Sequence, residues 1–173
     1  MYNTLLRGND PGLVIECLNG YRLKEKLPSN LLDYTVPFGI PEIIKEGTDI
    51  TIVTYGSTLR VVQDAVQILE TFNISCEIVD VQTLLPFDLH HKICGSLKKT
   101  NRIVFVDEDV PGGAAGYMFN KVMEEQGGYR YLDVAPRTIT AKAHRAAYGS
   151  DGDYFSKPNA EEIEAIIKEM MKE

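Results

Sequence analysis

From Asp49 onward, segments rich in β-branched residues alternate with segments whose apolar residues recur at helical spacing. Strands are predicted at residues 50–55, 76–81 and 102–106, with shorter ones at 131–134 and 138–140. After the first of these, helical spacing is carried by Leu59, Val62, Ala65, Val66 and Leu69. Strands separated by helices pair in parallel, so this alternation predicts an α/β fold. We expect three layers (α/β/α), with helices on both faces of an open, mostly parallel sheet.

Polar residues precede three of the predicted helices and are suited to cap them. Ser57 stands before the first helix, Asp88 before a helix that runs through Lys98, and Asn159 before the last helix. A side-chain oxygen at such a position can accept a hydrogen bond from a free backbone N–H of the first turn. A further helix is predicted between the glycine-rich turn at residues 111–113 and Gln126.

The first 48 residues do not follow this alternation. One apolar run, residues 13–18, predicts a strand, but the segment from Asn19 to Gly47 has little periodicity and contains three prolines. A lone strand followed by a long connector has no core to join. We therefore expect residues 1–20 to be the remnant of a preceding domain, residues 21–48 an extended interdomain linker, and residues 49–173 one α/β domain.

Charge and cysteine content exclude several classes of function. The 25 acidic and 18 basic residues give a net charge of −7, which disfavours binding to nucleic acid or to an anionic membrane. No apolar run approaches the ~20 residues of a membrane span, and the N-terminus does not resemble a signal peptide. Cys17, Cys76 and Cys94 lie far apart and form no CxxC pair, so we expect free, buried thiols in a soluble, cytoplasmic protein.

Glycines and polar residues follow the predicted strands, where open α/β sheets bind their ligands. A functional interpretation is an anion-binding turn made by Gly56, Ser57, Gly112 and Gly113. The alternative is that these glycines only allow tight strand-to-helix turns. The three acidic residues at 107–109 would repel a phosphate, and no GxGxxG or GxxxxGK[ST] motif is present. The structural interpretation is therefore favoured.

No residue pattern predicts a catalytic, cofactor-binding or metal site within this chain. His90 and His91 are adjacent and would point about 100° apart on a helix, so solvated surface is favoured over a metal site. A response-regulator type of magnesium pocket would need an acidic pair after the first strand, which ends in Tyr55. The fragment from Asp151 to Asp153 lacks the later ligands of a calcium loop. Nucleophile motifs such as GxSxG are also absent.

A long irregular stretch, residues 141–158, stands out before the last helix. Long irregular segments inside compact domains are often functional. Aromatic and basic residues of the kind found at protein interfaces gather in it. The candidate interface residues are His144, Arg145, Tyr148, Tyr154 and Phe155. An ordinary surface loop is the alternative.

Four spaced motifs resemble the transketolase-type C-terminal domain, and specifically the beta subunit of the decarboxylating component of 2-oxo acid dehydrogenases. They occur in the order of that family and cover nearly the whole chain. The motifs are YTVPFG at 34–39, EGTDITIVTYG at 46–56, VDVQTLLPFD at 79–88, and KTNRIVFVDE at 99–108 with Gly112 and Gly113 just beyond.

The resemblance implies an enzyme that oxidatively decarboxylates a 2-oxo acid, with branched-chain substrates favoured over pyruvate or acetoin, and passes the acyl group to a lipoyl domain. It also implies that residues 1–20 are the remnant of a pyrimidine-binding domain that precedes the linker. Its cofactors would be thiamine diphosphate and Mg²⁺, held by parts of the enzyme outside this chain, which alone is expected to be inactive. The implied partners are an alpha subunit or alpha half, a second beta copy, and the peripheral-subunit-binding domain of a lipoyl transacylase.

Two departures from the family pattern are visible. Gln82 replaces an arginine of the family, and residues 141–158 replace a shorter segment, as expected for a subgroup whose alpha and beta parts are fused in one polypeptide. A second hypothesis of a different class remains: a free-standing α/β module that binds a small ligand or anion at the turns beside Ser57 and Gly113.

Overall fold

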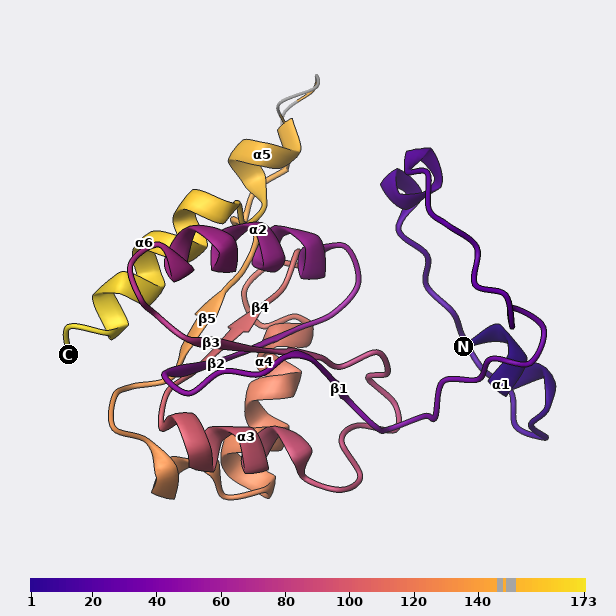
Figure 1. The fold of residues 1–173 in the computed structure, drawn as a ribbon, viewed down its shortest axis with the longest axis horizontal. Coiled ribbons are helices and arrows are strands. Elements are labelled where there is room, and N and C mark those ends of the chain that lie inside the picture. The colour runs from indigo at the N-terminus through magenta and orange to yellow at the C-terminus, as the bar shows by residue number, and fades with distance from the viewer. Residues whose placement is uncertain (146–147, 149–151) are drawn as a thin grey trace.

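The computed structural model describes the whole chain except residues 146–147 and 149–151, and its centre is a five-stranded sheet (Figure 1). The strands are β1 (Glu42–Lys45), β2 (Ile50–Thr54), β3 (Cys76–Asp80), β4 (Ile103–Val106) and β5 (Arg137–Ile139). They lie in the order β1-β3-β2-β4-β5. Strand β1 pairs with β3 in the antiparallel sense, and all other pairs are parallel. The predicted open, mostly parallel sheet is confirmed.

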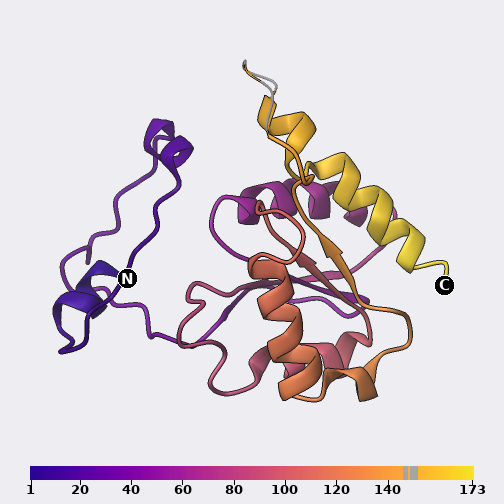
Figure 2. The ribbon, with the colours of Figure 1, turned by 180° about the vertical axis from the view of Figure 1, so that it is seen from behind.

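Helices cover both faces of this sheet, as the two opposite views show (Figures 1 and 2). On one face lie α2 (Thr58–Glu70) and α6 (Ala160–Met170). On the other lie α3 (Lys92–Thr100) and α4 (Ala114–Phe119), which continues as a π-helix, Asn120–Glu125. A short helix, α5 (Gly152–Ser156), precedes α6. The expected three layers are therefore present.

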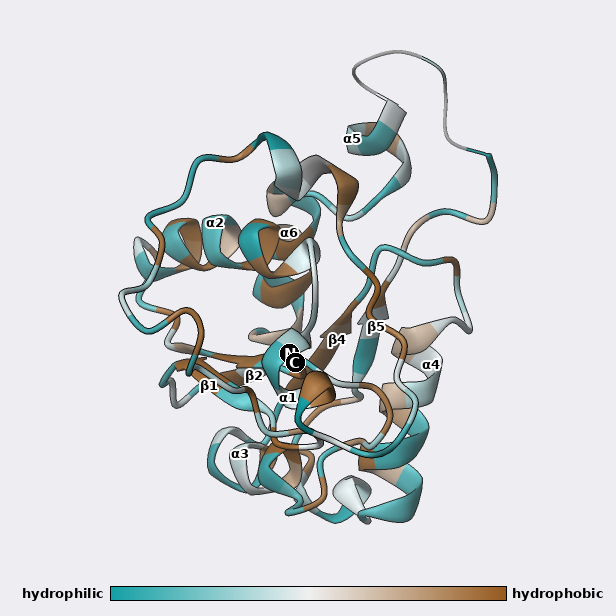
Figure 3. Cartoon of the chain, turned by 90° about the vertical axis from the view of Figure 1, so that its right-hand side faces the viewer, coloured by the Kyte–Doolittle hydropathy of each residue, from teal (hydrophilic) through white to brown (hydrophobic). Residues whose placement is uncertain are grey.

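The central strands are buried on both sides, which explains their nearly continuous apolar sequence. Every residue of β2 and β4 is buried. Ile50 and Ile52 belong to the hydrophobic cluster that includes α2 and α6, whereas Val53 and Phe105 belong to the cluster that includes α3 and α4. Strand β4 is hydrophobic, while α2 and α6 carry hydrophobic and hydrophilic residues together (Figure 3).

Two of the three predicted caps form. The carboxylate of Asp88 accepts hydrogen bonds from the N–H groups of Lys92 (2.8 Å) and Ile93 (3.0 Å), and Asn159 Oδ1 accepts one from Glu162 N–H (2.8 Å). The prediction for Ser57 is wrong, since its side chain makes no capping hydrogen bond. The neighbouring Thr58 instead donates to the carbonyl oxygen of Tyr55 (2.6 Å) and tightens the turn.

The minor strands were harder to predict. The strand expected at 138–140 is present as β5, but the one expected at 131–134 is not, because the chain forms a 3₁₀ helix at Gly128–Tyr131 and then turns toward β5. Strand β1 was not foreseen. The strand expected at 13–18 does not form either, because a strand needs a neighbour to pair with and these residues have no ladder partner.

The first 37 residues, here called the arm, extend to one side of the α/β domain (Figures 1 and 2). They contain α1 (Tyr2–Leu6) and a 3₁₀ helix, Leu18–Arg22. The arm folds back on itself, because Asn3 Nδ2 donates to the carbonyl oxygens of Leu31 and Tyr34 at 2.8 Å each.

Two of the three cysteines match the expectation of free, buried thiols. Cys76 and Cys94 are buried, Cys17 is half-buried, and all three are free. Burial raises the pKa of the Cys76 thiol to about 12. Among the described residues, every helix is too short or too polar to cross a bilayer.

Candidate functional site

A buried carboxylate organises the end of β4, the edge where ligands of α/β sheets usually bind. Asp107 is fully buried, and its Oδ1 accepts hydrogen bonds from the hydroxyl of Tyr55 (2.7 Å) and the N–H of Asp109 (3.2 Å). Its Oδ2 accepts one from Ala115 N–H (2.9 Å), in the first turn of α4. Burial and then the bond to Asp107 raise the pKa of Tyr55. The two N–H groups hold the turn into α4, and the Tyr55 hydroxyl ties this turn to the end of β2, so Asp107 has a structural role here.

The glycines of the proposed anion-binding turn have backbone reasons for their identity. Gly56 (φ +61°) and Gly112 (φ +89°) lie in the left-handed region that side chains disfavour. At Gly113 an added Cβ would lie 2.4 Å from Asp109 Oδ2. The tight-turn interpretation thus accounts for all three, and anion binding at these turns stays a prediction.

A hollow of about 360 Å³ lies between the start of α2 and the segment that joins α5 to α6. Both Ser57 and Tyr154 line it, although nearly one hundred residues separate them in sequence. Its ionic lining consists of four carboxylates and one amine, from Asp64, Glu108, Asp153, Glu161 and Lys157. The Lys157 ammonium lies 3.0 Å from Glu108 Oε2 and 3.7 Å from Asp153 Oδ1. This electrostatic environment suits a cationic group better than an anion.

The candidate interface residues divide into two groups. Tyr154 and Phe155 lie in α5, half-exposed or more, with their rings edge to face at 5.4 Å. His144, Arg145 and Tyr148 are exposed in the preceding segment, where the Arg145 guanidinium lies 4.7 Å from the centre of the Tyr148 ring. Of the five, only Tyr154 lines the hollow.

The structure describes the two adjacent histidines, but it describes the calcium-loop fragment only in part. His90 and His91 are exposed, as expected, although they precede α3 instead of lying within it. Asp151, part of the calcium-loop fragment, lies outside the described residues. Within the described part of the chain, no group of three or more His, Cys, Asp or Glu side chains is placed to hold a metal ion.

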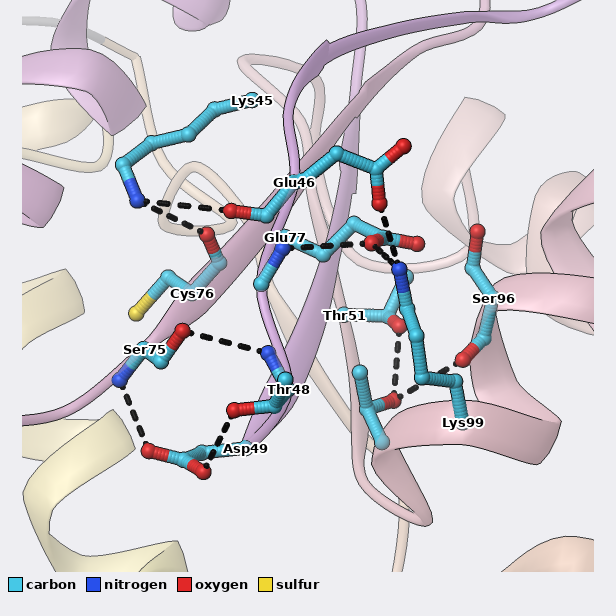
Figure 4. Close-up of polar contacts among 12 residues, drawn as sticks. Lys45, Glu46, Thr48, Asp49, Thr51, Ser75, Cys76, Glu77, Ser96 and Lys99 are labelled. Carbon is cyan, nitrogen blue, oxygen red and sulfur yellow. Dashed lines mark hydrogen bonds and ion pairs between the residues drawn. The ribbon is translucent and has the colours of Figure 1, made fainter.

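A second polar cluster, at the opposite edge of the sheet, was missed by the sequence interpretation. It is centred on Glu77, a fully buried glutamate in β3 that contacts Lys99 of α3 (Figure 4). The available signal was a charged residue in the otherwise apolar run at 76–79. The partner, however, comes from a motif more than twenty residues away. Gln82, where the family has arginine, donates from its Nε2 to Glu42 Oε2 (2.8 Å) and so ties the end of β3 to β1.

The sequence profile described as "Transketolase, C-terminal domain" matches residues 39–160, which include every strand of the sheet. The chain belongs to the transketolase C-terminal domain family. The resemblance carried by the four motifs is therefore confirmed at the level of the family. The matched segment begins within the part of the chain predicted to be a linker, because β1 is part of the sheet.

Relatives of this family member are beta subunits. It is 33% identical over 165 residues to the pyruvate dehydrogenase E1 component subunit beta of Acholeplasma laidlawii, covering 94% of this chain and 49% of that protein. It is 28% identical over 166 residues to the 2-oxoisovalerate dehydrogenase subunit beta of Bacillus subtilis (strain 168), covering 95% and 50%. The chain thus spans about half the length of these curated relatives.

The fold has solved counterparts. A split-gene transketolase, solved as an inactive beta4 tetramer, matches with a TM-score of 0.64 and 21% identity over 82% of this chain and 44% of that chain. At this identity the likeness concerns the fold alone. It agrees with the sheet order and the helix layers described above.

Proposed function

We propose that this chain is the C-terminal assembly domain of the beta part of a 2-oxo acid dehydrogenase, in the component that decarboxylates the substrate. The family match and the names of its relatives support this assignment. Those relatives are about twice as long as this chain. The domain would join the remaining parts of the enzyme, and thiamine diphosphate and Mg²⁺ would be held by those other parts.

The arm is the observation that carries the proposal. Four of its aliphatic side chains are more than four-fifths exposed: Leu6 (82%), Leu13 (87%), Ile15 (84%) and Leu32 (82%). Apolar surface of this extent marks an interaction site, because burying it releases roughly 25 cal/mol per Å². The arm would therefore be the segment against which the rest of the beta part packs.

The charges at the carboxyl edge of the sheet do not fit a diphosphate cofactor. A diphosphate needs cations or free N–H groups, whereas the hollow beside Ser57 is lined by four carboxylates and a lysine that is already paired. We therefore assign no cofactor-binding residue in this chain. The same charges suit a basic partner, such as the peripheral-subunit-binding domain of a lipoyl transacylase, with steering by opposite charge.

The substrate that we propose is a branched-chain 2-oxo acid, with pyruvate as the alternative. The Bacillus subtilis relative supports the first and the Acholeplasma laidlawii relative the second. Comparing the rates of the complete enzyme with 3-methyl-2-oxobutanoate and with pyruvate distinguishes them. A higher kcat/KM for pyruvate would overturn the branched-chain proposal.

The assembly role is tested by mixing this chain with the part of the Acholeplasma laidlawii subunit that it does not match, and following the mixture by sedimentation velocity. We expect a one-to-one complex with the natural chain. The double variant Leu13→Asp/Ile15→Asp should abolish it, because charges would replace the apolar contact surface. Leu85→Asp, at a residue 81% exposed outside the arm, is the matched control and should leave it intact. Binding that the arm variant does not weaken would contradict the proposal.

A free-standing anion-binding module is the second candidate, and thermal unfolding separates it from the first. A ligand that binds the folded state raises the Tm in proportion to ln(1 + [L]/Kd). We expect thiamine diphosphate with Mg²⁺, ATP and inorganic phosphate each to leave the Tm of the isolated chain unchanged. A concentration-dependent rise with any of them would favour the module.

A further inference from the structure

The connection between β1 and β2 crosses the start of β3, because β3 lies between these two strands in the sheet. Only residues 46–49, here called the crossover, span this distance. At its centre an added Cβ on Gly47 would lie 2.2 Å from the carbonyl carbon of Cys76 and 2.3 Å from the nitrogen of Glu77. These are backbone atoms, so the crossover fits against β3 only with glycine at this position.

Hydrogen bonds fasten the far end of the crossover to the residue before β3 (Figure 4). The N–H groups of Thr48 and Asp49 both donate to the carbonyl oxygen of Ser75, at 3.2 and 2.9 Å. In return, Ser75 N–H donates to Asp49 Oδ2 at 2.7 Å. This end is therefore held by neutral donors and one carboxylate that belongs to the crossover itself.

The near end of the crossover is held by a buried charge. The Glu77 side chain is fully buried, and its Oε2 accepts a hydrogen bond from Gly47 N–H (3.2 Å) and pairs with the ammonium of Lys99. That ammonium also lies 2.5 Å from Glu46 Oε2. Glu77 Oε1 is buried and has no hydrogen-bond partner among the described residues. The Lys99 ammonium is thus the cation that compensates a carboxylate enclosed beneath the crossover.

The other charged and polar side chains near this cluster bind partners other than Glu77. Lys45, the last residue of β1, lies 3.1 Å from Glu70 of α2. Asp49 is bonded to Ser75 and to the Thr48 hydroxyl. On the side of α3, the nearby hydroxyls of Thr51 and Thr100 pair with each other at 2.7 Å. Loss of the Lys99 charge would therefore leave Glu77 enclosed with only the Gly47 N–H to stabilise it.

We propose that Glu77, Lys99 and Glu46 form a latch whose ion pairs keep the edge strand β1 and the crossover closed over β3, so that removing the charge opens this edge without unfolding the domain. A carboxylate enclosed without a cation is strongly unfavourable, and the enclosure ends when the crossover lifts. The hydrogen bonds between β1 and β3 oppose this opening only weakly, since β1 has four residues and an irregular register between Ile43 and Lys45. The open state would uncover the edge of β3, where another strand could pair.

Amide hydrogen exchange measured by mass spectrometry on the full chain tests the latch. In Lys99→Met we expect peptides covering residues 42–48 to exchange roughly tenfold to a hundredfold faster. This range lies between the effects of losing an exposed and a fully buried ion pair, because Lys99 is partly exposed and Glu77 is buried. Peptides from β2 and β4 should keep their natural rates. Lys99→Arg retains the charge and should retain protection. The double variant Lys99→Met/Glu77→Gln should regain it, because a neutral amide can still accept from Gly47 N–H.

Three outcomes would overturn the proposal. The first is natural protection of residues 42–48 in Lys99→Met. The second is equal acceleration in all strands, which would indicate global destabilisation. The third is a double variant that is as open, or as poorly folded, as Lys99→Met, since Lys99 would then act through its packing and not through its charge.

Discussion

Gly47 shows how one residue can fix the path of the chain in this sheet. Glycine is required at this position because the backbone of β3 lies too close to leave room for a Cβ, not because φ is positive. The sequence pattern EGTD at 46–49 therefore has a physical meaning: a glutamate that pairs with Lys99, a glycine that crosses β3, and an aspartate that bonds to Ser75. The lysine begins another of the four family motifs, so two motifs that are separate in sequence form one structural unit.

Gly47→Ala should destabilise the domain by about 3 kcal/mol or more, because the methyl group would have to displace the backbone of β3. Gly95→Ala is the matched control. Gly95 lies exposed within α3 with nothing within 4 Å of an added Cβ, so alanine should stabilise the helix by about 0.5–1 kcal/mol. Urea unfolding of the three proteins measures both effects. Equal stability of Gly47→Ala and the natural chain would contradict the crossing described here.

The latch also predicts a dependence on pH. The hydrogen bond from Lys99 holds the pKa of Glu46 below its ordinary value of 4.5, and Glu46 with Glu77 raises the pKa of Lys99 above 10.5. The stabilisation from Glu46 is present above pH 4.5 and is lost as pH falls through its folded pKa. That from Lys99 is present below pH 10.5 and is lost as pH rises through its folded pKa.

The Tm difference between the natural chain and Lys99→Met should therefore be flat between about pH 6 and pH 9 and should shrink below pH 4.5. Thermal unfolding followed by circular dichroism at a series of pH values measures it. A difference that changes steadily across the neutral range would show that other groups control this edge.

At the scale of elements, the sequence predicts best the buried strands and the helices whose apolar residues recur at regular spacing. The strands β2, β3 and β4 and the helices α2, α3 and α6 follow from β-branched runs and helical spacing, because each is packed on a core that selects apolar residues. Strand β1 could not be predicted, since its four residues alternate only between exposed and half-buried and its partner β3 lies more than thirty residues ahead. The run at 131–134 has strand-like composition, but β5 occupies the place beside β4.

The arm and β1 should differ sharply in their importance for stability. Removing residues 1–37 should leave the Tm within about 2–3 °C of the natural value, because the ion pair between arm and domain, Glu25 with Arg60, is exposed and worth at most about 1 kcal/mol. Removing residues 1–48 also deletes β1 and Gly47 and should lower the Tm much further. Differential scanning calorimetry of both truncations checks this. Similar Tm values for the two would show that β1 contributes nothing to the fold.

At the scale of the whole molecule, the family and the layers could be predicted, but the candidate site could not. Four ordered motifs were enough to identify the family. The hollow that joins Ser57 to Tyr154, and the cluster that joins Glu77 to Lys99, depend on tertiary contacts between distant segments. No local pattern encodes such contacts. The charges of the hollow add to the reasons against an anion at the turn beside Ser57, and they support the basic partner that we propose.

We propose that this chain assembles a decarboxylating enzyme without performing its chemistry. The most direct measurement is the reduction of an artificial electron acceptor by the purified chain, with thiamine diphosphate, Mg²⁺ and either pyruvate or 3-methyl-2-oxobutanoate. A complete 2-oxo acid dehydrogenase serves as the positive control. We expect a rate equal to that of protein-free buffer with both substrates. Saturable turnover that requires thiamine diphosphate would contradict the claim.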